Sequence, residues 1–494
     1  MTTRNSEQMA DGSRYHGGRR AFVTVLAAAI VVGALAAWHV ASQGLTLSHF
    51  DARAHLVVAR RVIDSLTPGW RQFGALWLPL PHLLNAVPVQ WDAAYRSGFT
   101  GVVISIGALS WGLAAVAERA FTRTGSWVVA IVPSALIIAD PNVLYLMSTP
   151  MSEPLLFGTA LLSLAALDAW IDVPTSSRRA RAAWFLAALV MTRYEGWPIA
   201  AALILAATIA NRRQGVAEIG RLVFPSAFAI AAFLGLGYAS SGQWFLSSSF
   251  FVPEPELFHQ PLHVLRVMRT GLEDLANPVI LICGAAGAAI CLIESRKSPT
   301  ALLPLSLLAA GALPFAAFYA GHPFRIRYMV MLVVANLLLA GVTLAAMPRR
   351  SRTLAGIALV SLAIWARPPL GPPAPVLVEA RAADNLRLAR EEVSHVLQGM
   401  YDGTPILASM GSLGHYMHES SAIGLDLRNF LHEGNGDLWL EALRSPRLSV
   451  RWILIEERAE GGDILAARAR ASEDFLSGFD RVVEAGGLAL YRRR

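Results

Sequence analysis

Residues 21–41, AFVTVLAAAIVVGALAAWHVA, form an unbroken apolar run, and this run decides the fold class. A helix of about 20 apolar residues crosses the hydrocarbon core of a bilayer. The run follows a polar, basic segment, residues 1–20. A signal peptide is the competing interpretation, but the run is long for one and Gln43-Gly44-Leu45 makes an unconvincing cleavage site. The sequence therefore predicts an uncleaved first span with residues 1–20 as a cytoplasmic tail.

Similar apolar runs recur as far as residue 366. They are centred near residues 107, 133, 162, 187, 203, 230, 285, 309, 337 and 360, which gives about eleven spans in all. Hydrophobic residues make up 54% of the chain, and charged residues make up 16%, against about 25% charged residues in a typical soluble domain. Because the runs are continuous rather than alternating, helices are favoured over barrel strands. We expect a mainly α, polytopic transmembrane bundle over residues 21–366.

Short basic loops between the runs predict the orientation of the bundle. Lys and Arg collect on the cytoplasmic side of membrane proteins. With the N-terminus inside, the cytoplasmic loops carry five basic clusters and few acidic residues: Arg119/Arg123, Arg178/Arg179/Arg181, Arg212/Arg213, Arg296/Lys297 and Arg349/Arg350/Arg352. An odd number of spans then places the C-terminal segment outside. The long loop over residues 42–96 lies outside as well.

The charge pattern argues against nucleic-acid binding, and the cysteine spacing argues against a disulfide. The net charge is +7, but the basic residues cluster between apolar runs, as membrane topology requires, so we expect no nucleic-acid partner. Cys283 and Cys291 are eight residues apart in one run, roughly 12 Å along a helix. That separation is too long for a disulfide.

The tail differs from the spans in composition. Residues 367–376 form a proline-rich linker, and residues 377–494 mix charged helical stretches with short apolar runs. We expect strands at 405–409, 450–455 and 488–491, and helices at 377–399, 411–420, 437–444 and 462–477. This alternation predicts a small extracytoplasmic α/β domain.

The first external loop holds the leading catalytic candidate. Asp51 and His55 are four residues apart and share a face of a helix that we expect to run to about Leu66. A carboxylate at this place is suited to act as a general base or to hold a metal ion. The alternative is structural, because Ser48 followed by Asp51 fits a helix N-cap pattern. His82 follows the proline-rich stretch WLPLP (77–81).

Two further groups lie at outer span ends. Asp140 and Glu153 flank the corner between two spans, where ionisable groups are costly and often functional. Two basic segments lie on the outer side, against the positive-inside rule: Arg193-Tyr194-Glu195 and His322-Pro323-Phe324-Arg325-Ile326-Arg327-Tyr328. Arginine binds phosphate through two parallel hydrogen bonds, so these segments are suited to bind a lipid phosphate. The alternative is that the arginines reach toward lipid headgroups or form local ion pairs.

Taken in order, these segments resemble the GT-C superfamily of membrane glycosyltransferases. The matching features are the acid after the first span, the P-x-P segment of the same loop, PMSEP (150–154), TRYEG (192–196) and RIRY (325–328). The most similar members are bacterial proteins related to protein mannosyltransferases and lipid A aminoarabinose transferases. The resemblance implies a GT-C-like bundle in the bacterial inner membrane, followed by a small outer domain.

The same resemblance implies a reaction and its residues. Such enzymes transfer a sugar from a polyprenyl-phosphate donor to a lipid, glycan or protein acceptor on the outer face. Asp51 and Glu153 match the catalytic acids, and a divalent metal ion is a possible cofactor. The predicted substrate-binding residues are His55, His82, Asp140, Arg193, Glu195, His322, Arg325, Arg327 and Tyr328.

Two other functions stay open at this point. A lipid or polysaccharide transporter would show internal repeats or charged groups near mid-span, and the sequence indicates neither. An inactive GT-C-like scaffold is the second, because this chain has one acid in Asp51-Ala52-Arg53 where most relatives carry a pair.

Overall fold

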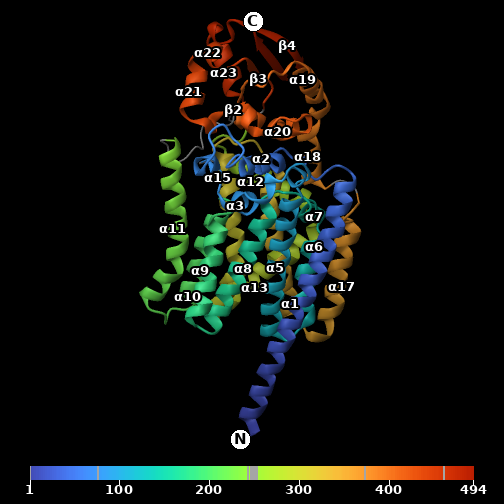
Figure 1. The fold of residues 1–494 in the computed structure, drawn as a ribbon. Coiled ribbons are helices and arrows are strands. Elements are labelled where there is room, and N and C mark those ends of the chain that lie inside the picture. Colours follow the sequence, from blue (N-terminus) through green and yellow to red (C-terminus); the bar gives the residue numbers. More distant parts are fainter. Residues whose placement is uncertain (1, 75–76, 242–243, 245–253, 372–373, 460–461) are drawn as a thin grey trace.

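Each of the eleven apolar runs is helical in the computed structural model, which describes residues 2–74, 77–241, 244, 254–371, 374–459 and 462–494. The helices stand side by side as a bundle (Figure 1). Their bounds are α1 (Thr2–Ser42), α5 (Phe99–Thr124), α6 (Trp127–Ala139), α7 (Pro141–Met147), α8 (Glu153–Asp172), α9 (Ser176–Val190), α10 (Gly196–Ala210), α11 (Val216–Ser241), α12 (Pro261–Leu275), α13 (Pro278–Glu294), α14 (Leu302–Leu305), α15 (Ala312–Tyr319), α16 (Val330–Ala346) and α17 (Arg349–Ala366), with η3 (Pro299–Ala301), η4 (Ser306–Gly311) and η5 (Ile326–Met329) between them.

Membrane-spanning length is reached by some of these helices alone and by others only when neighbouring helices are joined. Within the described residues, six are long and apolar enough to cross a bilayer, and two bent pairs qualify when each is taken as one span. The pairs are α6 with α7, bent by 75°, and α12 with α13, bent by 115°. The predicted bundle is thus confirmed as a fold class, and the number of eleven spans stays a prediction.

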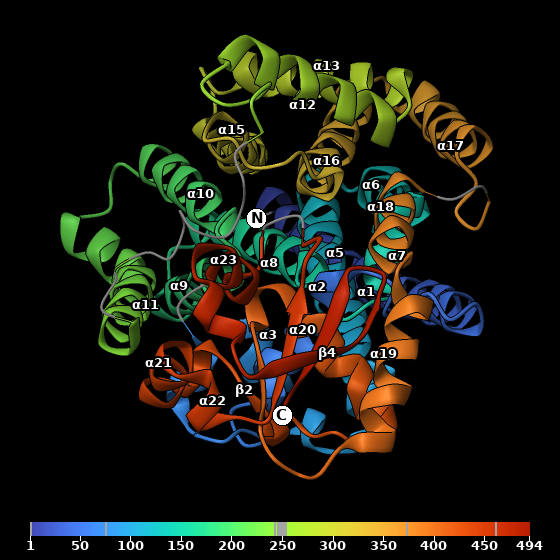
Figure 2. The same cartoon turned by 90° about the horizontal axis from the view of Figure 1, so that it is seen from above.

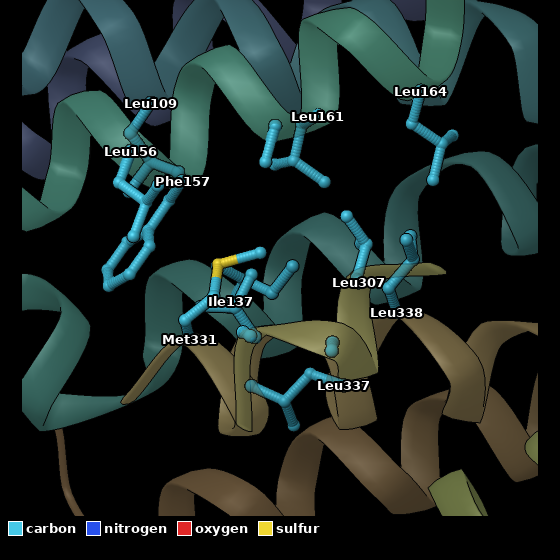
Figure 3. Packing of buried hydrophobic residues seen from close by; sticks show 14 of the residues in the cluster. Leu109, Ile137, Leu156, Phe157, Leu161, Leu164, Leu307, Met331, Leu337 and Leu338 are labelled. Atoms are coloured by element: carbon cyan, nitrogen blue, oxygen red, sulfur yellow. The ribbon is translucent and has the colours of Figure 1, made fainter. Parts of the chain in front are cut away.

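The core of the bundle is aliphatic and closely packed. Figure 3 shows Leu109 of α5, Phe157 of α8 and Met331 of α16 among the buried side chains that meet at its centre. Gly158 lets α8 approach α5 closely, because a Cβ atom at this position would lie 2.2 Å from the carbonyl oxygen of Ala108. Small residues at helix contacts serve this purpose in membrane bundles, where dispersion forces hold the helices together.

At the N-terminal end of the bundle, acidic side chains accompany the basic loops. Arg119 lies 2.7 Å from Asp168, and Arg123 lies 2.6 Å from the same carboxylate. Arg179 forms an ion pair with Glu218. The expectation of few acidic residues here is therefore too simple, because acids at neighbouring helix ends pair with these arginines. The orientation rule counts Lys and Arg only, so the predicted orientation is unaffected.

Short helices fill the first long loop, namely α2 (Phe50–Arg60), η1 (Trp70–Phe73), α3 (Leu80–Asn85), η2 (Pro88–Gln90) and α4 (Asp92–Ser97). The expectation that the first of them reaches Leu66 is wrong, since α2 ends at Arg60. The Asp64 carboxylate instead accepts hydrogen bonds from the backbone N–H groups of Leu427 and Arg428. Asp64 thus contacts the tail from beyond the end of α2.

The tail folds as an α/β unit, as the sequence predicts. Its five-stranded sheet has the order β2-β1-β3-β5-β4, with β1 parallel to β2 and β3, and β5 antiparallel to β3 and β4. The elements are α18 (Pro375–Asp384), α19 (Arg387–Met400), β1 (Ile406–Ala408), α20 (Met410–Glu419), η6 (Ser420–Ile423), η7 (Leu427–Asn429), β2 (Phe430–Leu431), η8 (Glu433–Asn435), α21 (Asp437–Arg444), α22 (Pro446–Ser449), β3 (Trp452–Glu456), α23 (Ile464–Ala471), η9 (Glu473–Leu476), β4 (Phe479–Ala485) and β5 (Leu488–Arg493).

The start of the tail differs from expectation in two details. The single helix expected over residues 377–399 is two helices, broken at Asn385 and Leu386, and asparagine favours helix ends over helix interiors. The first of the two, α18, already begins at Pro375, inside the segment predicted as a linker.

The tail and the first loop share one hydrophobic core. Leu56 and Val57 of α2 are fully buried in the same cluster as Phe430 and Trp452 of the sheet. Figure 1 shows the tail at the end of the bundle opposite the N-terminus. In the view from above (Figure 2), it lies over α2 and α3, and α12 and α13 are outside its cover. The first loop is therefore enclosed between the bundle and the tail.

Candidate functional site

Charged side chains from five segments meet at the end of the bundle that the tail covers. These segments are the first turn of α2, the start of α8, the turn between α9 and α10, η5 and α18. Four of the five are helix starts or turns, where polar backbone groups are available. The residues that they contribute are Asp51, Glu153, Arg193, Glu195, Arg327 and Glu379.

Arg327 is the centre of this cluster. Its Nη2 lies 2.5 Å from Oδ2 of Asp51, its Nη1 lies 3.3 Å from Oε1 of Glu379, and its Nε lies 3.5 Å from Oε1 of Glu153. The side chain is buried, and Nη1 also contacts the ring of His49. Burial alone would raise the pKa of Asp51, but the surrounding charges, of which Arg327 has the largest effect, together outweigh burial and hold the pKa well below its usual range. Asp51 is therefore a carboxylate at neutral pH.

Arg193 contacts the same oxygen of Glu153. Its Nη1 lies 3.1 Å from Oε1 of Glu153, and its Nη2 lies 2.8 Å from Oε1 of Glu195. Nη1 also donates a hydrogen bond of 2.9 Å to the Ser152 hydroxyl. The two guanidinium groups thus flank one buried carboxylate.

The space around Glu153 has unused hydrogen-bonding capacity. Among the described residues, neither carboxylate oxygen of Glu153 accepts a hydrogen bond, and Nε of Arg327 donates none. Glu153 is only 2% exposed. Buried polar atoms are nearly always hydrogen-bonded in native proteins, so such groups at one place call for a functional explanation. A donor and two acceptors facing one another are suited to bind a polar group.

A chain of hydrogen bonds joins Arg193 to two buried histidines. Because Arg193 can only donate to Ser152, the hydroxyl hydrogen of Ser152 is directed at Nε2 of His55, 3.2 Å away. His55 then donates from Nδ1 to Nε2 of His82, at 2.9 Å. Burial lowers the pKa of His55 to about 3 and that of His82 well below its usual value, so both rings are neutral. Trp77 covers them, with ring centroids 4.3 and 5.9 Å away.

Tyr328 and its neighbours border the arginines. Its ring centroid lies 5.8 Å from the guanidinium carbon of Arg193 and 5.3 Å from that of Arg327, within cation–π range. The ring of His322 is 5.7 Å from Tyr328. Arg325 immediately precedes η5. Burial lowers the pKa of His322, and the charge of Arg325 lowers it further.

Asp140 has a different position. Its Oδ1 accepts hydrogen bonds from the backbone N–H groups of Asn142 (2.9 Å) and Val143 (3.1 Å), so that it caps α7. Pro141 at the first helical position completes this start signal. Asp140 thus stabilises the start of α7, and its role in substrate binding stays a prediction.

Three residues of the site escaped the sequence patterns. His49, and not Ser48, is the N-cap of α2, and its Nδ1 accepts from the backbone N–H of Asp51. The capping alternative for Asp51 is wrong in this form, because the Asp51 carboxylate faces Arg327. Ser152 adjoins Glu153 and had no signal of its own. Glu379 lies in the tail, and only long-range folding brings it here.

A divalent metal ion stays a prediction. Metal sites built by the protein alone use several carboxylate, imidazole or thiolate groups that converge on one point. In the described part of the chain, no three such side chains do so. Asp51 and Glu153 face arginines instead. No step of the reaction proposed below uses a metal ion.

Comparison with known proteins identifies solved structures with a similar fold. Two crystal structures of ArnT from Cupriavidus metallidurans match it, and each match covers 95% of this chain and 97% of the other. The structure bound to undecaprenyl phosphate has a TM-score of 0.57 at 13% identity, and the apo structure has a TM-score of 0.53 at 14% identity. No family model and no curated protein matches the sequence. The predicted helical bundle with a small α/β tail is therefore confirmed, as an ArnT-like fold over nearly the whole chain.

Proposed function

We propose that this protein is a membrane glycosyltransferase that transfers a sugar from a polyprenyl-phosphate donor to an acceptor hydroxyl of a lipid, glycan or protein. One observation carries the proposal, namely the partly buried Arg193 and the buried Arg327 beside Glu153, next to the Asp51 carboxylate. Two guanidinium groups at the end of a membrane bundle are suited to bind the phosphate of a lipid. The fold supports this assignment, since an ArnT structure of the same fold is bound to undecaprenyl phosphate.

The reaction follows from these groups. The acceptor oxygen attacks the anomeric carbon of the sugar, and the bond between that carbon and the phosphate oxygen breaks. The electron pair of this bond leaves with the polyprenyl phosphate, and the acceptor proton passes to the Asp51 carboxylate. Arg193 and Arg327 stabilise the charge that develops on the departing phosphate. A phosphate is a stable leaving anion, so the reaction needs no acid catalyst.

Glu153 and the neutral histidines support the two arginines in this scheme. Glu153 contacts both guanidinium groups through one oxygen, Oε1, and so holds the two arginines at one place. His55 and His82 direct the Ser152 hydroxyl away from Arg193, which leaves the arginine as the only donor in that contact. We place the reaction on the extracytoplasmic face, where the positive-inside rule puts this end of the bundle.

Binding of undecaprenyl phosphate to the purified full-length protein tests the proposal. We expect the wild-type protein to bind this lipid in preference to uncharged undecaprenol. Arg193→Ala and Arg327→Ala should each weaken binding by about tenfold or more, because a charge-assisted hydrogen bond contributes 1.5–3 kcal/mol.

Arg119→Ala is the matched control for these variants, because Arg119 is ion-paired to Asp168 at the opposite end of the bundle. Its affinity for undecaprenyl phosphate should equal that of the wild type. Equal affinity of the wild type for the two lipids, or unchanged binding in both site variants, would contradict the proposal.

A further inference from the structure

The tail contributes a carboxylate to the site through α18. Oε1 of Glu379 lies 3.3 Å from Nη1 of Arg327 and 3.2 Å from Nε2 of His49. Oε2 accepts a hydrogen bond of 2.9 Å from the backbone N–H of Ile326, the first residue of η5. Glu379 therefore holds both the backbone and the side chain of the segment that carries Arg327.

The position of Glu379 is fixed from three directions. Val376 and Ala380, on either side of it in α18, are fully buried in the core of the bundle. The backbone N–H of Val376 donates to Oδ1 of Asn142, at the start of α7. At the other end of α18, Asp384 accepts a hydrogen bond of 2.8 Å from Arg53 of α2. A carboxylate held in this way keeps its place during a reaction, which a surface ion pair would not.

Two carboxylates form ion pairs with the two terminal nitrogens of the Arg327 guanidinium. Asp51 contacts Nη2, and Glu379 contacts Nη1. The third nitrogen, Nε, then faces Glu153 and donates no hydrogen bond among the described residues. Because the guanidinium group is planar and rigid, fixing two nitrogens fixes the direction of the third.

We propose that Glu379 is a positioning residue for the transfer reaction, and that it directs Arg327 toward Glu153 and Arg193, beside which the proposed function puts the donor phosphate. This inference rests on the proposed function. It makes α18 a working part of the site, so that the transmembrane bundle alone is incomplete. Glu379 acts through Arg327 and touches neither the sugar nor the phosphate.

Two possible roles of Glu379, a nearby negative charge or a positioning group for Arg327, predict opposite effects of Glu379→Gln on anion binding. Glu379→Gln keeps the shape of the side chain and an acceptor for Ile326, but it removes a negative charge beside the phosphate site. If Glu379 were only a nearby charge, its loss would reduce repulsion and tighten binding of an anion. If it positions Arg327, the same change weakens binding.

The test measures undecaprenyl phosphate binding to full-length variants, with thermal unfolding as the check on folding. We expect Glu379→Gln to weaken binding about tenfold, the effect of one charge-assisted contact. Glu379→Asp keeps the charge but is one methylene shorter, so it should also weaken binding. In an Arg327→Ala background, Glu379→Gln should cause no further loss, since a residue that acts through Arg327 has nothing left to direct.

Glu391→Gln is the matched control, because Glu391 is an exposed glutamate of α19 paired with Arg387, and its binding should stay at the wild-type level. Unchanged or tighter binding by folded Glu379→Gln protein would overturn the inference and leave the proposed function intact. A further loss in the Arg327→Ala background would overturn it too, as would failure of both Glu379 variants to fold. A wild-type protein that does not distinguish undecaprenyl phosphate from undecaprenol would remove both proposals.

Discussion

At the scale of single residues, Asp51 has two roles that an amide lacks, since it pairs with Arg327 at 2.5 Å and can accept a proton. Asp51→Asn should therefore lower sugar transfer by at least about 100-fold, the lower range for loss of a general base. The amide fills the same volume, so insertion into the membrane should be unchanged. Transfer assays on purified protein check the rate.

Asp92→Asn is the matched control for this variant. Asp92 lies in the same loop and pairs with Arg60 at 2.6 Å, but its side chain is 54% exposed. Transfer by this control should proceed at the wild-type rate. If Asp51→Asn also retained that rate, Asp51 would not be the base.

Sequence patterns predicted some of the residues that meet at this site. Asp51, Glu153, Arg193 and Arg327 stand out because charged residues at outer span ends are costly and few, and the structure brings all four together. Their catalytic and binding roles stay predictions. Glu379 could not be found in the same way, because it lies in a charged helix of the tail and meets Arg327 across 52 residues of sequence.

At the scale of elements, α2 is clamped to the tail by Arg53. Its Nη1 lies 2.7 Å from Glu419 of α20, and its Nη2 lies 2.8 Å from Asp384 of α18. Arg53→Ala leaves both carboxylates largely buried with one fewer cation, which should destabilise the tail by about 2 kcal/mol. We expect faster hydrogen exchange in α18 and α19 and little change in the bundle.

Arg96→Ala provides the comparison, since Arg96 is half exposed and forms only a 3.6 Å pair with Asp92. Exchange in the tail should match the wild type in this variant. Equal exchange rates in Arg53→Ala and wild-type protein would show that the clamp does not hold α18.

Elements were predicted as well as their hydrophobic patterns allowed. Long apolar runs gave helices, and β1, β3 and β5 follow from short apolar stretches. Two strands had no such signal. One is β2, with only two residues, and the other is β4, an edge strand whose charged Asp480, Arg481 and Glu484 are suited to an unpaired sheet edge. The shared core of α2 and the sheet depends on contacts that no local pattern encodes.

At the scale of the whole molecule, the two ends of the chain lie at opposite ends of the bundle (Figure 1). The five basic loops predict that the N-terminus is cytoplasmic and the tail is extracytoplasmic. Alkaline phosphatase matures only in an oxidising compartment. A fusion after Arg494 should therefore be active in a bacterial host, and a fusion after Arg213 should be inactive. The reverse pattern would place the site on the cytoplasmic side.

Mass analysis of the lipids that co-purify with the full-length protein tests the central claim most directly, because it identifies the class of donor without prior choice of a sugar. The proposed function predicts a polyprenyl phosphate, or its glycosylated form, bound to the wild-type protein and depleted in Arg193→Ala and Arg327→Ala protein. Recovery of bulk phospholipids alone, in the same amounts from the wild type and from both variants, would contradict it.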